Sequence, residues 1–239
     1  MKHKMRDSVV RDVIAYDGNH FSKVPRELVE EISIEIYVND ERAGELACSP
    51  WEIKEAAIGY LYMKSYFSTF EEVSKISVSE DGKVHVTTRT DVSKDKAEPD
   101  MEKLKVSADE VIKLAGILEN GSVLFHRTGG VHCAALARNG EFIVYKEDVS
   151  RHVAVDKVIG TCLEQKIPMK NGILVFSGRV PAEIMQKVAA MGCGMIIARS
   201  APTDYACHMA EKFGITLVAF ARDDKFNVYT HPEKIYNVE

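Results

Sequence analysis

The chain has 239 residues, of which 46% are hydrophobic and 28% are charged, an ordinary composition for a globular protein with a sizeable core. Its formal net charge of −5 argues against a general nucleic-acid or membrane-surface binder, because such proteins carry basic surfaces. Met1–Arg6 is basic but no apolar stretch follows it, and no apolar run reaches the roughly 18 residues of a membrane span. We therefore expect a cytoplasmic protein without nucleic-acid or membrane partners.

The N-terminal third predicts strands joined by tight turns. A strand is expected near Ser8–Tyr16, followed by a turn at residues 17–19. Between residues 32 and 38, isoleucine and valine alternate with other residues, which predicts a half-buried strand that turns at Asn39-Asp40. A further hairpin is predicted around Asp81-Gly82.

One helix is predicted between these strands. Ser49 is expected to cap it, with Pro50 in the first helical position and Glu52 completing a capping box. Apolar residues then recur at helical spacing and predict a core-facing side, made of Ile53, Ala56, Ala57, Tyr60 and Leu61.

The segment Thr90–Lys105 is charged and nearly free of apolar residues, so it is expected to be an exposed linker or flexible loop. It predicts a division into a small α+β lobe over residues 1–100 and a larger α/β domain over residues 101–239. The larger domain is expected to begin with a helix capped by Ser107, whose apolar face contains Val111, Leu114, Ala115 and Leu118.

The stretch Phe125–Gly160 is the one around which the chain is organised. Asn139-Gly140 lies between two short apolar runs and predicts a hairpin that pairs Val131–Ala137 with Glu141–Lys146. Glycines precede this hairpin, and polar residues follow it and lead into a helix expected over Val153–Gln165. A plain hairpin does not need such residues at both open ends, so a site is expected there.

The remaining chain alternates strands and helices. Buried strands are predicted at Ile173–Phe176, Met195–Ala198 and Thr216–Phe220, with helices between them and a last short strand at Phe226–Tyr229. This alternation predicts a largely parallel layer with covering helices.

Two loops at the carboxyl ends of these strands predict an anion site. Ser177-Gly178-Arg179 and Ser200-Ala201-Pro202-Thr203 each precede a helix, whose free N–H groups and dipole favour an anion. Loops at this edge of a parallel sheet form the usual ligand crevice, and Arg179 suits phosphate. Helix capping without a ligand is the simpler alternative, because Ser, Pro and Thr are ordinary helix starters.

Histidines and cysteines do not form a recognisable metal motif. His126, His132 and His152 lack the spacing of a structural zinc site, so no metal is expected. The five cysteines contain no C-x-x-C, which disfavours disulfides and zinc ribbons. Cys133 alone lies in the polar stretch, either as a reactive thiol beside the site or as a buried core residue.

Several motifs in fixed order resemble the formate dehydrogenase accessory sulfurtransferases of the FdhD type, over about Glu27 to the C-terminus. They are Thr128-Gly129-Gly130-Val131-His132, Glu147-Asp148-Val149-Ser150-Arg151-His152, Ala154-Val155-Asp156-Lys157, the two loops above, and Phe220-x-Arg222 followed by Phe226-Asn227-Val228-Tyr229. The resemblance implies an α/β fold with a cytidine-deaminase-like C-terminal domain without zinc, plus a small N-terminal α+β lobe.

The same resemblance implies function. Members are held to carry sulfur from a cysteine desulfurase to the molybdenum bis(molybdopterin guanine dinucleotide) cofactor, so that formate dehydrogenase becomes active, and to form homodimers. Matched to this chain, the binding segment falls on Phe220, Ala221, Arg222, Asp223, Asp224 and Lys225. The predicted pocket also takes in Ser177, Gly178, Arg179, Ser200, Ala201, Pro202, Thr203, Gly129, Gly130, His132, Asp148, Arg151, His152, Asp156 and Lys157.

One departure from the family pattern divides the functional hypotheses. Typical members carry a C-G-x-C-G segment whose first cysteine bears the persulfide, whereas Thr90–Lys105 contains no cysteine. Either Cys133 relays sulfur instead, or the protein is a cofactor-binding chaperone without covalent chemistry. An unrelated zinc hydrolase of the deaminase class is the third hypothesis, poorly supported because its P-C-x-x-C is absent.

Overall fold

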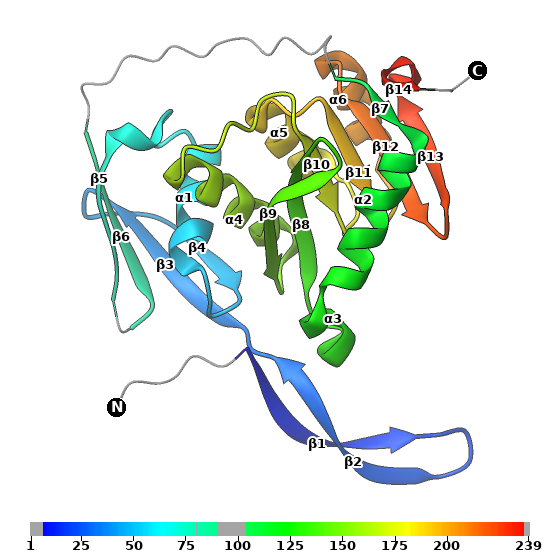
Figure 1. Ribbon diagram of the computed structural model, residues 1–239. Coiled ribbons are helices and arrows are strands. Elements are labelled where there is room, and N and C mark those ends of the chain that lie inside the picture. Colours follow the sequence, from blue (N-terminus) through cyan, green and yellow to red (C-terminus); the bar gives the residue numbers. More distant parts are fainter. Residues whose placement is uncertain (1–6, 80, 90–103, 237–239) are drawn as a thin grey trace.

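The structure is a computed structural model and describes residues 7–79, 81–89 and 104–236. Its main body is a six-stranded sheet in the order β13-β12-β11-β10-β8-β9 (Figure 1). The strands are β8 (His132–Arg138), β9 (Glu141–Asp148), β10 (Ile173–Phe176), β11 (Met195–Ala198), β12 (Thr216–Arg222) and β13 (Lys225–Thr230).

The sheet is mixed, whereas the sequence predicted a largely parallel layer. Only the central strands β10, β11 and β12 pair in parallel; β10 and β11 are fully buried apolar runs, as predicted, and β12 is buried from Thr216 to Ala219. The flanking pairs β8–β10, β8–β9 and β12–β13 are antiparallel, because a hairpin is attached at each side. The Asn139-Gly140 hairpin is confirmed, and both turn residues have the positive φ that this turn requires.

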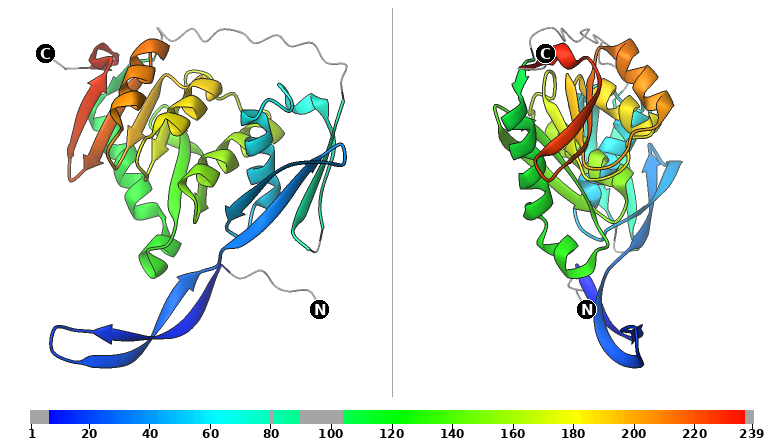
Figure 2. Two further views of the ribbon diagram at one scale, coloured as in Figure 1. Left: turned by 180° about the vertical axis from the view of Figure 1, so that it is seen from behind. Right: turned by 90° about the vertical axis from the view of Figure 1, so that its right-hand side faces the viewer.

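Helices cover both faces of this sheet (Figure 2). The helix α2 (Ala108–Gly121) packs on one face, and the short α3 (Val123–Thr128) follows it. The other face carries α4 (Arg151–Glu164), α5 (Ala182–Met191) and α6 (Asp204–Phe213). The predicted apolar face of α2 and its Ser107 cap are confirmed, since Ser107 Oγ accepts a hydrogen bond from Glu110 N at 3.1 Å.

A second, four-stranded sheet in the order β4-β3-β6-β5 lies beside the first and carries α1 (Ile53–Met63). Its strands are β3 (Ile32–Val38), β4 (Glu41–Cys48), β5 (Val73–Val78) and β6 (Lys83–Thr88). The helices α1 and α4 touch through two glycines, because a Cβ on Gly59 or Gly160 would lie 2.0 Å from the carbonyl oxygen of Asp156 or Glu55. This contact needs glycine on both helices.

The remaining strands are short pairs. β1 (Ser8–Tyr16) and β2 (Phe21–Val29) form a hairpin that extends away from the body (Figure 1), and β7 (Val106–Ser107) pairs with β14 (Ile235–Tyr236). Two 3-10 helices, Phe70–Glu72 and Pro232–Lys234, complete the described structure. The predicted linker lies outside the described residues, except for Leu104 and Lys105.

The predicted cap of α1 was wrong. Ser49 is fully buried and its Oγ accepts a hydrogen bond from Val149 N at 3.0 Å, while its own N–H donates to Asp148. Glu52, in the left-handed region at φ 53°, is the residue before the helix. Ser49 therefore joins the N-terminal sheet region to the end of β9 instead of capping the helix.

Candidate functional site

The predicted site residues gather at one edge of the six-stranded sheet. The parallel strands β10, β11 and β12 all end there. Because β8 runs antiparallel to β10, its first residue lies at the same edge, where His132 pairs with Asp148 at the end of β9. Carboxyl ends of parallel strands are the usual location of ligand crevices in open α/β sheets.

The two predicted anion-binding loops lie side by side at this edge. Val180 N donates to Ala201 O at 3.0 Å, and Thr203 N donates to Val180 O at 3.0 Å. Arg199 N, just after β11, donates to Phe176 O at 2.9 Å. Backbone hydrogen bonds therefore join the loops that follow β10 and β11 into one surface.

On the side of α4 and α5, basic and imidazole groups surround the first of these loops. His132 Nδ1 lies 3.4 Å from Ser177 Oγ, and a Cβ on Gly178 would lie 3.3 Å from Arg151 Cβ. The first residues of α4 and α5 have no side-chain cap, and Arg151 Nε is buried without a hydrogen-bond partner among the described residues. Free helix N–H groups and an unpaired guanidinium atom suit an anionic group.

The two histidines beside this loop are kept neutral near pH 7. Burial lowers the pKa of His132, and the charge of Arg151 lowers it further. Burial also lowers the pKa of His152, helped by Lys187 and Arg151. They can donate or accept single hydrogen bonds here, but they add little positive charge until the pH falls.

Three predicted site residues lie beneath the edge and are bonded within the chain. Asp148 and Lys157 are both fully buried, with 2.8 Å between Asp148 Oδ2 and Lys157 Nζ. Asp156 Oδ1 accepts from Lys187 Nζ at 2.6 Å, and burial raises the Asp156 pKa to about 6. These groups support the loops from below and do not face the solvent at the edge.

Gly129 and Gly130 serve the local backbone. Gly129 ends α3 with φ 67°, a left-handed conformation that favours glycine. A Cβ on Gly130 would lie 2.6 Å from Val29 Cγ1, at the base of the β1–β2 hairpin. The close approach of that hairpin explains the second glycine.

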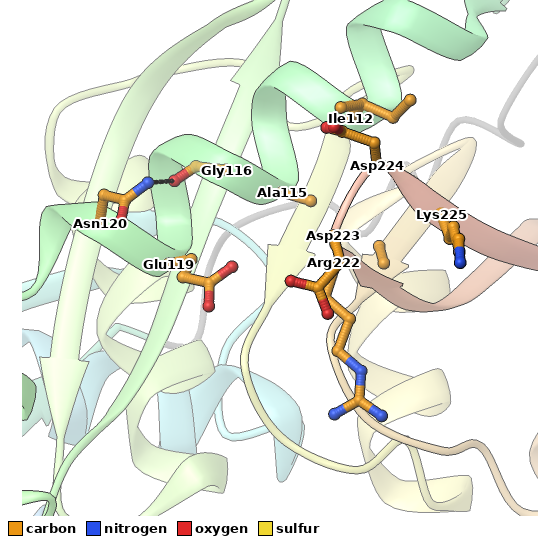
Figure 3. Close-up of a pocket in the computed structure, with 10 residues that line it drawn as sticks. Ile112, Ala115, Gly116, Glu119, Asn120, Arg222, Asp223, Asp224 and Lys225 are labelled. Carbon is orange, nitrogen blue, oxygen red and sulfur yellow. Dashed lines mark hydrogen bonds between the residues drawn. The ribbon is translucent and has the colours of Figure 1, made fainter.

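On the α2 face, the edge contains a hollow of about 220 Å³ between α2 and the β12–β13 turn (Figure 3). Ala221, Arg222, Asp223, Asp224 and Lys225 line one side, and Gly116, Glu119 and Asn120 are on the other. The Glu119 and Asp223 carboxylates lie on facing sides, and Arg222 points away from α2 (Figure 3). Neither anion-binding loop lines this hollow, so the structure splits the predicted pocket between two faces.

Comparison with known proteins assigns the chain to a family. The model of the FdhD/NarQ family matches residues 29–103 and 90–236. The chain belongs to the FdhD/NarQ family. Relatives named "Sulfur carrier protein FdhD" include those of Bacillus pumilus, 33% identical over 94% of this chain and 96% of the relative, and of Bacillus subtilis, 32% identical over 97% and 99%.

A solved structure shows the same fold. It is described as that of a formate dehydrogenase accessory protein from Desulfotalea psychrophila, and it superposes with a TM-score of 0.84 at 26% sequence identity. The match covers 96% of this chain and 100% of the other. The mixed α/β fold described above is thus one that an FdhD-type protein adopts.

The cysteines of this FdhD/NarQ chain are poorly exposed. Cys48, Cys133, Cys162 and Cys193 are buried, and Cys207 is half-buried. Burial raises the pKa of Cys48 and that of Cys162 to about 12, and it also raises the pKa of Cys133, where hydrogen bonds from Tyr145 and Ser122 act in the opposite direction. Cys133 is the one cysteine at the carboxyl edge, on the side opposite His132.

The described residues lack two features, a metal-binding cluster and a membrane-spanning helix. Within the described residues, no group of three or more His, Cys, Asp or Glu side chains is arranged to hold a metal ion. Over the same residues, no helix combines the length and the apolar character of a membrane span.

Sequence reasoning missed some residues at the edge of this FdhD/NarQ sheet. Arg199 forms an ion pair with Glu119 and so joins the end of β11 to α2. Arg199 directly follows a predicted buried strand, and Arg179 closely follows another. A position just after a buried strand is therefore a signal that could have identified Arg199. Tyr145 was also missed, and Glu147 was quoted in a family motif but not placed in the pocket; the alternation along β9 could have placed both on the same face as Cys133.

Proposed function

We propose that this chain is an accessory protein for formate dehydrogenase and that it binds the molybdenum bis(molybdopterin guanine dinucleotide) cofactor at the carboxyl edge of its sheet. The observation that carries the proposal is the convergence of both predicted loops, the α4 N-terminus and the Ala221–Lys225 segment on that one edge. The cofactor is a bound cargo, and its guanine nucleotide is the part that these residues can recognise.

The residues at the edge suit the guanine base at one place and the phosphates at another. Guanine presents N–H donors on its Watson–Crick edge, and carboxylates are the natural acceptors for them. The hollow has Glu119, Asp223 and Asp224 on its walls and therefore suits the base. The phosphates suit the loop at Ser177–Arg179, where the helix N-termini and Arg151 are available.

Sulfur transfer from a cysteine desulfurase is the second part of the proposal. The relatives are named sulfur carriers, and Cys133 is the cysteine of this chain that lies at the proposed binding edge. We further propose that the protein works in the cytoplasm as a homodimer, and that its C-terminal domain, residues 101–239, has a cytidine-deaminase-like fold without zinc.

A chaperone that binds the cofactor but relays no sulfur is the alternative. It is favoured by the burial of four of the five cysteines and by the absence of cysteine from Thr90–Lys105. Persulfide measured after incubation with a desulfurase and cysteine separates the two functions. Loading that disappears in Cys133→Ala supports the relay, and complementation of a deficient strain by a cysteine-free variant supports the chaperone.

Calorimetric titration with GDP tests the binding proposal itself. We expect binding to the wild type, weaker binding of ADP, and a loss of the preference for GDP over ADP in Asp223→Asn. Asp40→Asn is the matched control, because Asp40 is an exposed carboxylate at the turn between β3 and β4, in the separate four-stranded sheet. No heat at millimolar GDP, or equal affinity for both nucleotides, would contradict the proposal.

A further inference from the structure

A second pocket, of about 400 Å³, opens beside the carboxyl edge and belongs to none of the predicted binding segments. Trp51, Val123 and Leu124 give it apolar walls, and Tyr145 and Glu147 reach it from β9. The remaining lining residues are Asp7, Gly121 and Arg127. The pocket thus joins the N-terminal sheet region, α3 and the end of β9.

The charges on its walls leave a negative group unmatched. Arg127 is already bound to Glu27, with its Nε donating to Oε2 at 3.0 Å, and it also contacts Asp7 at 3.4 Å. Glu147 has no ion-pair partner among the described residues, and its Oε1 lies within hydrogen-bond distance of Tyr145 Oη, at 2.6 Å, and of Cys133 Sγ, at 3.9 Å. A pocket with apolar walls and an unpaired carboxylate suits a cation such as a lysine or arginine side chain.

The same carboxylate lies next to the Cys133 thiol. Cys133 Sγ is 3.9 Å from Glu147 Oε1 and 3.2 Å from Tyr145 Oη, and Cys133 pairs with Glu147 across β8 and β9. Cys133 is 4% exposed and does not line the pocket, whereas Tyr145 and Glu147, which contact its thiol, do. The Glu147 carboxylate and the Tyr145 phenol therefore lie between the pocket and the Cys133 thiol.

The groups that face the thiol act in opposite directions. Burial is the largest cause of the raised Cys133 pKa, and the charge of Glu147 raises it further, whereas hydrogen bonds from Tyr145 and from Ser122, after α2, lower it. Arg199, beyond the end of β11, also lowers the Cys133 pKa, but Arg199 is paired with Glu119. The one unpaired charge within reach of the thiol is thus the one that faces the pocket.

We propose that this pocket admits a cationic group, and that neutralisation of Glu147 by that group releases the Cys133 thiol for reaction. Insofar as the reaction is sulfur transfer, the inference rests on the proposed function. The thiolate attacks the outer sulfur of a donor persulfide. A bond forms between Cys133 Sγ and that sulfur, the donor's S–S bond breaks, and the donor leaves as a thiolate, so no oxidant is needed.

The test is the alkylation of Cys133 by iodoacetamide over a range of pH, with the Cys133 peptide quantified by mass spectrometry. Glu147→Gln should lower the pH at which alkylation reaches half its maximal rate, and each unit of that shift is about a tenfold gain in thiolate at neutral pH. Tyr145→Phe should move the midpoint the opposite way, because the thiolate loses a donor. Glu141→Gln, an exposed carboxylate on the same strand, should move nothing.

A second measurement adds a small cation and uses Glu147→Gln as its control. Butylammonium chloride should accelerate alkylation of wild-type Cys133 relative to sodium chloride at equal ionic strength, and it should do so less in Glu147→Gln. If the midpoint in Glu147→Gln is unchanged or higher, or if butylammonium has no effect, the inference is wrong. Because no nucleotide or desulfurase is present, these results are independent of whether the chain binds GDP or carries sulfur.

Discussion

The two faces of the sheet differ sharply at the carboxyl edge. On the α4–α5 face, ionisable residues are buried in pairs, and Asp148 with Lys157 joins β9 to α4. On the α2 face, carboxylates line two open pockets, and a thiol lies just behind one of them. The α4–α5 face, called the paired face below, thus carries buried ion pairs beneath the loops, and the α2 face carries carboxylates in open pockets.

This difference determines which substitutions the edge should tolerate. A buried ion pair adds little net stability, but removing one partner leaves an uncompensated charge and is costly. The buried pairs of the paired face therefore tolerate little change, whereas the exposed Asp223 and Asp224 on the α2 face can be replaced with small effects on folding. Mutations of the buried pairs and of these exposed groups should accordingly separate stability from binding.

The largest expected effect is on the paired face. Lys157→Met leaves Asp148 buried without a counter-charge, and we expect a loss of about 3–5 kcal/mol in the free energy of unfolding. Urea denaturation measures it. Lys166→Met, which breaks an exposed pair with Glu71, is the control and should change stability little. Equal losses in both variants would contradict the claim that the buried pairs of the paired face tolerate little change.

The next effect concerns the contact between α1 and α4. Gly59→Ala places a Cβ 2.0 Å from the carbonyl oxygen of Asp156, so the helices must separate, at a cost of about 1–3 kcal/mol or more. Gly116→Ala in α2 meets no atom within 4 Å and should stabilise by about 0.5–1 kcal/mol through helix propensity. Thermal melts of both variants compare the two, and opposite signs are expected.

The third effect is expected on nucleotide affinity and not on stability. Arg222→Ala and Arg179→Ala each remove an exposed guanidinium from the edge, and one charge-assisted hydrogen bond to phosphate is worth about 1.5–3 kcal/mol, roughly a tenfold or greater loss in GDP affinity. Stability should stay unchanged. If only Arg222→Ala weakens binding, the phosphates lie on the α2 face and the division proposed here must be revised.

The smallest effect is the pH dependence from His132. Its pKa is lowered in the fold, so the unfolded chain binds more protons, and stability is lost as the pH falls through about 6.5. Asp156, whose pKa is raised to about 6, contributes in the opposite direction. Comparing wild type with His132→Gln at two pH values cancels the Asp156 contribution. The variant should lose less stability than the wild type at the lower pH.

Local patterns predicted most elements of this fold. Alternating and continuous apolar runs gave β3 and β10 to β12, and Asn139-Gly140 gave the β8–β9 hairpin, because these signals depend on nearest neighbours in the chain. The strands β2 and β4 were not predicted. Polar residues alternate with apolar ones only weakly there, and pairing with a neighbouring strand supplies the missing stability.

The sequence predicted that the candidate site residues lie at one edge of the sheet, but not which of them are buried. The order of the motifs correctly predicted that the loops lie at one edge of the sheet. It carried no information on burial, so Asp148, Asp156 and Lys157 were expected to line a pocket. Ser49 likewise looked like a helix cap, whereas it bonds a segment 100 residues away. Such long-range hydrogen bonds have no local sequence signal.

Hydrogen–deuterium exchange with and without GDP tests the central claim most directly. If the carboxyl edge binds the nucleotide, amides of residues 177–180, 199–203 and 220–225 should exchange more slowly when GDP is present, and those of the Asn139-Gly140 turn at the opposite edge should not change. Slower exchange at that opposite turn, with none at the three carboxyl-edge segments, would show that the ligand site is elsewhere.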